Sequence, residues 1–290
     1  MSKIKIFSLG GLDENGKNMY VIEIDKDIFI FDCGLKYASG NMLGIDYIIP
    51  DYSYLVKNKK RIKGLFITHG HLENMGGTSD LISQIPNLKV YATKFTKYVL
   101  MENGVSANNI VEIKAYKKMN FGHVSLFPIS VSHSAPDAVM YVINTKDGAI
   151  CYTGDFIFDP SMMGAYDMDL GKIAYVGKQG VLCLLSESVF SENIGHTSPN
   201  HKLIDVFRNA IKNASGRVMF MVLPTHLYTI EEIFKASLNS HRKIVVMGKK
   251  LQNVINFGLK EGYLSVPLDT LGDLSNINDN NAILLICDDK

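Results

Sequence analysis

Short apolar runs with alternating hydrophobic and polar positions recur through the first two-thirds of the chain. Their β-branched and aromatic residues, and the turn residues beside them, are typical of β-strands. The predicted strands are residues 3–9, 19–24, 27–34, 63–69, 88–92, 110–116, 123–131, 138–145, 149–155 and 181–187. Helical spacing of apolar residues is clearest at 75–85, 94–103 and 200–213. The last helix is preceded by Thr197 and Ser198 as capping residues and by Pro199.

The pattern changes after about residue 214, where strands and helices alternate. The predicted order is a strand, a helix, a strand, a helix and a strand, at residues 216–223, 229–239, 242–248, 250–261 and 281–287. This alternation is typical of a parallel α/β unit. We therefore expect a first domain at residues 1–210 and a second at residues 211–290.

Composition and charge place few restrictions on function. The chain has 290 residues, of which 47% are hydrophobic, so it is long enough to bury a sizeable core. Its 30 Lys and Arg residues nearly balance its 29 Asp and Glu residues. No global field therefore draws the chain toward nucleic acid or anionic lipid. One basic run is a local candidate for phosphate contact, although such runs are usually solvated faces: Lys57, Lys59, Lys60, Arg61 and Lys63.

Several features indicate a cytoplasmic protein. The N-terminus lacks the apolar core and cleavage site of a signal peptide. No apolar run approaches the roughly 18–20 residues that span a bilayer, so no membrane contact is expected. The four cysteines are far apart and form no C-x-x-C pair; they are expected to be buried free thiols, as in a reducing compartment: Cys33, Cys151, Cys183 and Cys287.

Candidate metal ligands follow three of the predicted strands. His69 and His71 lie after one strand, His133 ends another, and Asp155 ends a third. Imidazole and carboxylate groups are the usual ligands of Zn²⁺ in proteins, so these residues predict a metal site if the strand ends meet. The other histidines considered match no motif and are expected on loop or helix surfaces: His196, His201, His226 and His241.

Several stretches together resemble one known family. In chain order they are GGLDENGKNMYVIE, FDCGLKYASGNMLGIDYIIPDYSYL, IKGLFITHGH, YATKFT, SHSAPDAV, YTGDFIFD and GVLCLLSES. This series resembles the ribonuclease J family, and the chain is interpreted as a divergent and truncated member. The resemblance implies an α/β fold: a metallo-β-lactamase four-layer αββα sandwich at 1–210, incomplete at its C-terminal part. The start of a parallel α/β β-CASP module would follow at 211–290.

The resemblance also implies a chemistry. Family members use two Zn²⁺ ions and a shared hydroxide to cleave RNA, as 5′-to-3′ exonucleases and as endonucleases. They form homo-oligomers or assemble with a paralogue. His69, His71 and His133 match the three histidines of the first ion, and Asp155 matches the carboxylate that bridges both ions and takes part in catalysis.

The ligands of the second ion depart from the family pattern. Glu73 stands where the motif H-x-H-x-D-H has Asp, and Asn74 stands where it has its last His. The resemblance therefore makes Glu73 doubtful as a ligand and catalytic residue, and Asn74 doubtful as a ligand. The family's late His would lie beyond residue 290, and its SDS motif appears as SES at 186–188. Asp32 resembles a position that supports the site, or is a turn carboxylate that caps backbone amides.

These departures lead to one hypothesis and two alternatives. The chain is expected to be a ribonuclease J-like RNA-processing protein with a degenerate dinuclear site, weak or inactive as a nuclease alone. It would bind one Zn²⁺ at most, with Mn²⁺ and Mg²⁺ left open, and act as a partner subunit of an active paralogue. The first alternative is an active metal-dependent ribonuclease. The second is a small-molecule metallo-hydrolase, which the β-CASP-like features disfavour.

Overall fold

The computed structural model describes residues 1–290 except 41, 196–202, 274, 276–280 and 288–290. The chain divides into two compact units. Unit 1 comprises residues 1–133 and 137–196, and unit 2 comprises residues 134–136 and 197–290. The predicted helix cap at 197–199, together with His196 and His201, lies outside the described residues.

A mixed six-stranded sheet forms one layer of unit 1, in the order β1-β2-β3-β6-β7-β8. Its strands are β1 (Ile4–Gly10), β2 (Met19–Ile24), β3 (Asp27–Phe31), β6 (Ile62–Phe66), β7 (Val90–Ala92) and β8 (Ile110–Glu112). β1, β2 and β3 pair antiparallel, whereas β3, β6, β7 and β8 run parallel. All of β3 is buried, as expected for a strand covered on both faces. Because β3 and β6 are parallel, their carboxyl ends reach the same edge of the sheet.

A five-stranded sheet forms the second layer, in the order β13-β12-β11-β10-β9. Its strands are β9 (Met119–Phe121), β10 (Val124–Ser130), β11 (Val139–Thr145), β12 (Gly148–Tyr152) and β13 (Val181–Leu185). β9 to β12 pair antiparallel, and β13 runs parallel to β12. The parallel pair requires a crossover, which contains helix α5 (Leu170–Gln179).

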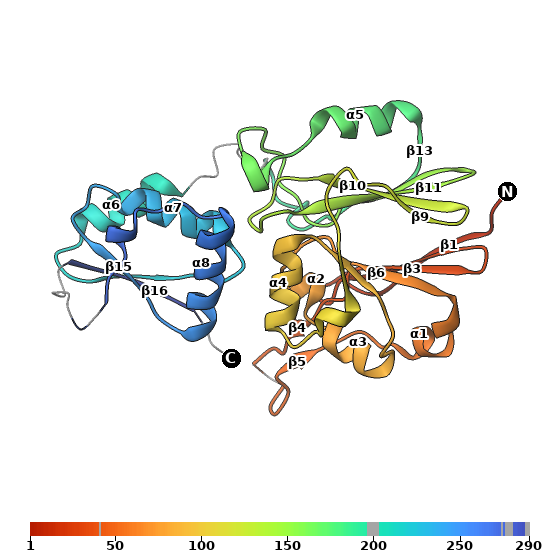
Figure 1. The fold of residues 1–290 in the computed structure, drawn as a ribbon, viewed down its shortest axis with the longest axis horizontal. Coiled ribbons are helices and arrows are strands. Elements are labelled where there is room, and N and C mark those ends of the chain that lie inside the picture. The colour runs from red at the N-terminus through yellow and green to blue at the C-terminus, as the bar shows by residue number, and fades with distance from the viewer. Residues whose placement is uncertain (41, 196–202, 274, 276–280, 288–290) are drawn as a thin grey trace. The chain divides into compact units, whose positions relative to one another are not determined.

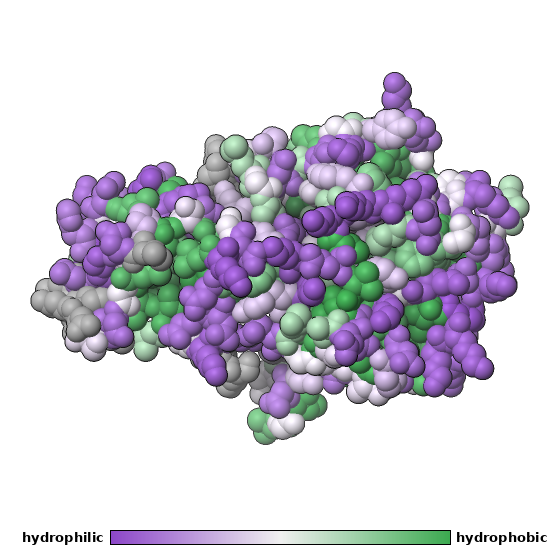
Figure 2. Space-filling model, in the orientation of Figure 1, coloured by the Kyte–Doolittle hydropathy of each residue, from purple (hydrophilic) through white to green (hydrophobic). Residues whose placement is uncertain are grey.

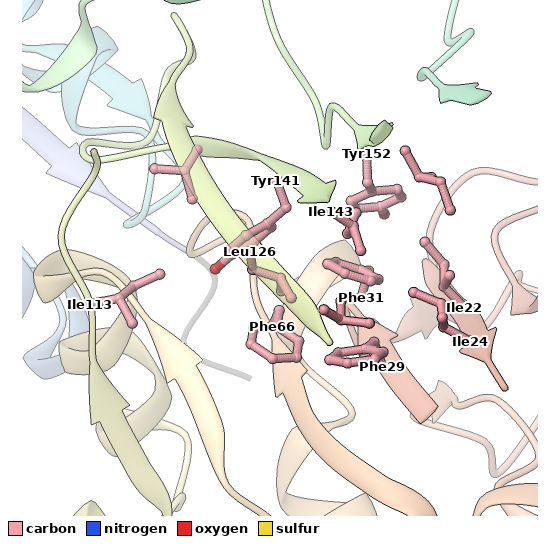
Figure 3. Packing of buried hydrophobic residues seen from close by; sticks show 13 residues of the cluster. Ile22, Ile24, Phe29, Phe31, Phe66, Ile113, Leu126, Tyr141, Ile143 and Tyr152 are labelled. Atoms are coloured by element: carbon pink, nitrogen blue, oxygen red, sulfur yellow. The ribbon is translucent and has the colours of Figure 1, made fainter. Parts of the chain in front are cut away.

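The main core of unit 1 lies between the two sheets (Figure 3). Phe29, Phe31 and Phe66 from the first sheet meet Tyr141 and Tyr152 from the second, and all are buried. Four helices cover the outer face of the six-stranded sheet (Figure 1): α1 (Ser53–Lys57), α2 (Leu72–Met75), α3 (Thr78–Gln84) and α4 (Lys94–Glu102). A second cluster of apolar side chains joins the five-stranded sheet to α5 on its outer face. Unit 1 is therefore the predicted four-layer αββα sandwich.

Unit 2 contains a three-stranded parallel sheet in the order β14-β16-β15. Its strands are β14 (Val218–Met221), β15 (Lys243–Val246) and β16 (Ala282–Ile286), and its helices are α6 (Ile204–Asn213), α7 (Leu227–Ser237) and α8 (Lys249–Glu261). α7 buries Leu227, Ile230 and Phe234 at helical spacing. α8 ends at Gly262, whose φ of 79° is the left-handed conformation that commonly ends a helix. The predicted parallel α/β character is confirmed.

The sequence pattern missed the short or weakly periodic elements. Residues 36–37 and 47–48 form a two-residue pair, β4 and β5, and no period is detectable over so few positions. The short helix α1 and strand β9 were missed for the same reason. α5 was missed because Gly171 and Gly177 lie within it, and glycine weakens the helical signal. Packing of Leu170, Ile173 and Val176 against the five-stranded sheet stabilises this helix despite its glycines.

Strand β13 leaves apolar side chains exposed at the edge of its sheet. It pairs with β12 alone among the described strands. Leu182 is 54% exposed and Leu184 is 61% exposed, while Cys183 and Leu185 on the other face pack on the core. On the face shown in Figure 2, hydrophilic residues cover most of the surface and hydrophobic residues lie scattered among them.

The cysteines are free, as predicted, but they are not all buried. Cys33 and Cys151 are buried, whereas Cys183 and Cys287 are half-buried. Among the described residues, no helix has the length and apolarity needed to cross a bilayer.

Candidate metal centre

The candidate ligands lie where strands from both sheets of unit 1 end. His69 and His71 belong to the loop that leaves β6, and His71 is the extended residue before α2. His133 lies just after β10, and Asp155 lies just after β12. The sandwich therefore brings together residues that are up to 86 positions apart, counted from His69 to Asp155.

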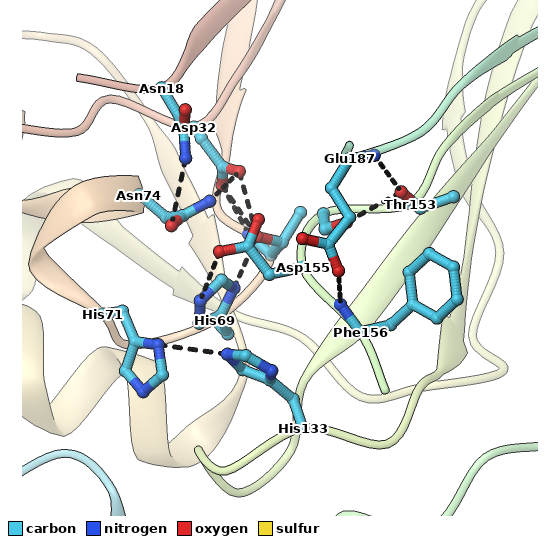
Figure 4. Close-up of polar contacts among 12 residues, drawn as sticks. Asn18, Asp32, His69, His71, Asn74, His133, Thr153, Asp155, Phe156 and Glu187 are labelled. Carbon is cyan, nitrogen blue, oxygen red and sulfur yellow. Dashed lines mark hydrogen bonds and ion pairs between the residues drawn. The ribbon is translucent and has the colours of Figure 1, made fainter. Parts of the chain in front are cut away.

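The three histidines form a compact group that can hold one metal ion (Figure 4). Their ligand atoms all lie within 4.8 Å of one another, and His133 Nε2 is 3.1 Å from His71 Nδ1. Two nitrogens on one tetrahedral Zn²⁺, at bonds of about 2.0–2.1 Å, would lie about 3.3 Å apart. His69 and His71 are buried and His133 is half-buried. This donor set fits zinc in both chemistry and spacing.

Thr68 determines the orientation of the His69 ring. Its hydroxyl lies 2.9 Å from His69 Nδ1 and 3.0 Å from both oxygens of Asp32. An ionised carboxylate only accepts, so the single hydroxyl hydrogen goes to Asp32 and His69 Nδ1 must donate to the hydroxyl. We assign the His69 proton to Nδ1 on this basis, which leaves the lone pair of Nε2 on the side of the other ligands.

Asp32 is the polar centre beneath the ligands. It is fully buried and accepts hydrogen bonds from the Thr68 amide at 2.8 Å, Asn74 Nδ2 at 2.9 Å and the Tyr152 hydroxyl at 2.9 Å. Burial raises its pKa to about 6, although these hydrogen bonds act in the opposite direction. Its φ of 58° is left-handed, which Asp tolerates better than most residues. The Asp32 carboxylate thus caps the Thr68 amide and also contacts His69 through the Thr68 hydroxyl. These are the two roles that the sequence analysis considered for Asp32.

Asp155 lies beside the histidines. Its Oδ2 is 3.7 Å from His69 Nε2, although it is not within the mutually close group of three. Burial, and next the charge of Glu187, raise the pKa of Asp155 to about 7. Carboxylates held so close to one another favour a bound cation.

Asn74 occupies a structural position. It is fully buried, and its side chain donates from Nδ2 to Asp32 and accepts at Oδ1 from Asn18 Nδ2 at 3.4 Å. The main-chain carbonyl of Glu73 accepts from the Asn18 amide at 3.0 Å. The half-buried Glu73 is not in the group of three mutually close ligands found among the described residues. The side-chain amide of Asn74 is therefore used to hold the loop together.

Glu187 is a site residue that the motif analysis did not select. Its carboxylate accepts from the Phe156 amide at 2.8 Å, which holds it close to Asp155 (Figure 4). Burial raises its pKa. The available signal was its position in SES, where the resembled family has SDS.

A cavity of about 640 Å³ in unit 1 includes Asp155 and Glu187 in its wall. Asp13, Glu14 and Glu192 also line it, and no Lys or Arg of the described part of the chain does. Of the histidines predicted to lie on loop or helix surfaces, His241 is exposed, as predicted. His226 is half-buried just before α7, so its predicted surface position is wrong. Burial lowers the pKa of His226 because it disfavours the charged imidazolium.

Two family models match the chain. Residues 12–172 match the metallo-β-lactamase superfamily, and residues 215–288 match the model described as ribonuclease J, β-CASP domain. The chain is 33% identical over 290 residues to ribonuclease J 2 of Staphylococcus aureus strain MRSA252. It is 33% identical over 291 residues to ribonuclease J 2 of Staphylococcus epidermidis. Both alignments cover 98% of this chain and 52% of the relative, so the chain spans about half the length of these relatives.

A solved structure shares the fold. It is the crystal structure of a protein of unknown function from Enterococcus faecalis V583, with a TM-score of 0.68 and 15% sequence identity. The match covers 100% of this chain and 78% of that chain. At this identity the likeness concerns the fold alone.

Proposed function

The chain belongs to the metallo-β-lactamase superfamily and, within it, to the ribonuclease J family, and from this premise we propose an RNA-processing role with a one-metal centre. The nuclease activity of this chain alone would be weak or absent. One observation carries the proposal: position 74 holds a fully buried amide, which donates to Asp32 and accepts from Asn18, and no imidazole. The family resemblance places a metal-binding His at this position.

The three histidines and Asp155 would hold the single ion. When bound, Zn²⁺ supplies a water whose pKa is near neutral. Thr68 keeps His69 in the tautomer that presents Nε2, and Asp32 fixes Thr68. Glu187, held by the Phe156 amide, keeps negative charge beside Asp155. Thr68, Asp32 and Glu187 thus position the ligands of a single ion, and no histidines of a second ion site are needed for this.

Formal charge explains the expected weakness. Asp32, Asp155, Glu187 and Glu73 together carry four negative charges when ionised, so one divalent ion leaves the site net negative and two would neutralise it. The carboxylate-lined cavity adds to this negative potential. A negative site disfavours the phosphodiester, which is itself an anion. Loss of the second ion should lower the cleavage rate by on the order of 10³-fold or more.

The active-ribonuclease alternative retains one supporting observation. The charge of Glu187 raises the pKa of Asp155, and carboxylates are the preferred ligands of Mg²⁺ and Mn²⁺. A second ion held by oxygens alone would restore the charge balance. The small-molecule hydrolase alternative has less support, because residues 215–288 match a ribonuclease J module.

Metal content and RNA decay test the proposal together. We expect the purified chain to hold at most one tightly bound Zn²⁺. His71→Ala should lose this ion, because His71 supplies one of the three histidine nitrogens that could hold it. His123→Ala is the matched control, since this unit 1 histidine is 42% exposed in its side chain and pairs with Asp25. Elemental analysis after dialysis measures the metal. Two tightly held ions per wild-type chain would contradict the one-metal centre.

The RNA arm uses 5′-monophosphorylated RNA with Zn²⁺, Mn²⁺ or Mg²⁺. We expect little or no turnover by the wild type in any of the three metals. Glu73→Asp combined with Asn74→His should recover little, because removing the Asn74 amide breaks its bond to Asp32. Robust wild-type cleavage that His71→Ala abolishes and His123→Ala preserves would establish the active-ribonuclease alternative.

A partner subunit role is a separate part of the proposal. Because Asn74 stands where the resembled family has a metal-binding His, an active paralogue would supply the complete catalytic centre in a mixed complex. Sedimentation of the chain, alone and mixed with a full-length ribonuclease J paralogue, tests this. A stable mixed complex is expected, and unchanged sedimentation of both components in the mixture would argue against it.

A further inference from the structure

A second cavity in unit 1, distinct from the metal centre, is lined by cations. It has a volume of about 320 Å³ and lies among the 3₁₀ helix η1 (Lys59–Arg61), the start of β6 and the loop between α3 and β7. Lys59, Lys60 and Lys63 come from the basic run seen in the sequence. Lys89, 26 positions after Lys63, joins them through the parallel pairing of β6 with β7.

The charge of this cavity is not balanced locally. Among the described residues, no Asp or Glu lines it. Lys63 pairs with Asp27 at 3.1 Å, and Lys89 donates to the Asn108 carbonyl at 2.9 Å, which leaves its charge uncompensated. Lys59 and Lys60 are exposed and make no ion pair with the described residues. The cavity therefore carries about three net positive charges on formal counting, which attracts anions.

Arg61 does not contribute to this surface. Its guanidinium is used for structure, with one hydrogen bond to the Lys26 carbonyl at 2.9 Å and an ion pair with Glu23 at 3.2 Å. These contacts anchor η1 to the first sheet. The neighbouring lysines are thereby held at the cavity on a short rigid element.

The cavity and the metal centre lie at opposite ends of β6. Lys63 is near the start of the strand and His69 lies beyond its end. Six residues at about 3.3 Å each correspond to roughly 20 Å along an extended strand. A single phosphate group cannot reach both sites, so any anion bound by the lysines occupies an independent site.

We propose that this cavity binds phosphate groups of a single-stranded RNA backbone, as a secondary site separate from the metal centre. Lysine side chains are flexible point charges that suit phosphates without reading bases. The accessible apolar part of the wall, formed by the half-buried Ile62 and the exposed Pro86, gives a nucleotide sugar or base a surface to contact. The lysine cavity supplies the positive charge that the acidic cavity at Asp155 lacks.

RNA binding, measured without catalysis, tests the site. Fluorescence anisotropy of a labelled single-stranded RNA is followed with the full chain in a metal chelator and, separately, in the His71→Ala background. Lys59→Ala combined with Lys60→Ala should weaken binding about tenfold and reduce the slope of log affinity against log salt by about 1.4, or 0.7 per lost contact. The same loss is expected in both backgrounds, because the metal centre is not involved.

The matched control is Lys117→Ala combined with Lys118→Ala. These adjacent unit 1 lysines are also exposed, and their removal changes the net charge equally. Equal weakening by both pairs, or no weakening by the first pair, would overturn the proposal. Failure here leaves the one-metal function intact, since that rests on metal content and cleavage.

Competitors identify the source of the phosphate. Unlabelled single-stranded RNA should displace the probe at far lower concentration than inorganic phosphate or a nucleoside monophosphate. A free phosphate or mononucleotide that competes as well as RNA would show a small-anion site and refute backbone binding. Poly-glutamate that competes as well as RNA would show a site for acidic protein segments, which also overturns the proposal.

Discussion

At the residue scale, the sequence predicted that His69, His71 and His133 come together, as they do, but it did not predict the hydrogen-bond partners of Asn74. His69, His71 and His133 follow strands, and their types alone indicate a metal. The bonds of Asn74 to Asp32 and Asn18 depend on three segments meeting in space, so no local pattern reveals them. Glu187 was missed because its partner is the backbone amide of Phe156, and backbone contacts leave no mark in the sequence.

Replacing Asp32 tests the buried network. Asp32→Ala should lower the free energy of unfolding by about 2–4 kcal/mol, because the Thr68 amide and Tyr152 hydroxyl lose their buried acceptor. The left-handed φ of this position adds to the loss, since Ala disfavours it. Urea unfolding measures the change.

Asp32→Asn is the control for this prediction. It keeps one acceptor oxygen and tolerates the left-handed conformation, so it should lose less stability than Asp32→Ala. Both variants should bind Zn²⁺ more weakly, because Thr68 no longer holds His69 through a carboxylate. Equal stability of Asp32→Ala and the wild type would show that the network is not a source of stability.

At the element scale, most strands of unit 1 were predictable because they carry a strong apolar pattern, whereas β4, β5 and β9 are too short to show one. The placement of α2 was not predictable, because it depends on a close backbone contact. The loop after β3 runs beside α2, with hydrogen bonds from the Cys33 amide to the Asn74 carbonyl at 2.7 Å and from the Leu35 amide to the Leu72 carbonyl at 2.9 Å. Gly34 lies between them, where a Cβ would be 1.6 Å from the Glu73 carbonyl oxygen.

Gly34→Ala should therefore move the loop away from α2 and destabilise unit 1 by about 3 kcal/mol or more. Gly177→Ala is the control: it adds the same methyl group in α5, where nothing lies within 4 Å, and should stabilise the chain by about 0.5–1 kcal/mol. Thermal unfolding compares the two variants, and metal content reports on the site. A melting temperature for Gly34→Ala equal to that of the wild type would mean that the contact is easily relieved.

At the scale of the whole molecule, the alternation of strands and helices predicted the α/β unit, and the family resemblance implied the four-layer sandwich; the structure has both. The sequence did not predict how charge is distributed. The net charge of +1 conceals an acidic cavity at one end of the first unit's sandwich and a lysine cavity at the far end of β6. Lys89 joins the lysines of the basic run in one cavity, and Glu14 joins Asp155 in the other, only when the chain is folded.

The exposed edge of β13 should make the chain associate with itself. An edge strand with one side not paired to any described strand, and with exposed apolar side chains, offers hydrogen bonds and apolar surface to another strand. We expect the weight-average mass in analytical ultracentrifugation to rise with concentration, and Leu184→Lys to reduce this rise. Met163→Lys, at a residue that is 80% exposed but outside the strand, is the control. Identical association of both variants would place the contact elsewhere.

The bond between Tyr152 and Asp32 also has an optical consequence. The chain contains no tryptophan, so its ultraviolet emission comes from its 14 tyrosines. Tyr152 is buried, and its hydroxyl donates to the carboxylate that holds Thr68 behind His69. A phenol bonded to a carboxylate emits weakly, and the strength of that bond follows the charge that surrounds Asp32. Three hydrogen bonds thus connect a native fluorophore, Tyr152, to the candidate ligand His69, and we expect its emission to change when the histidines bind an ion.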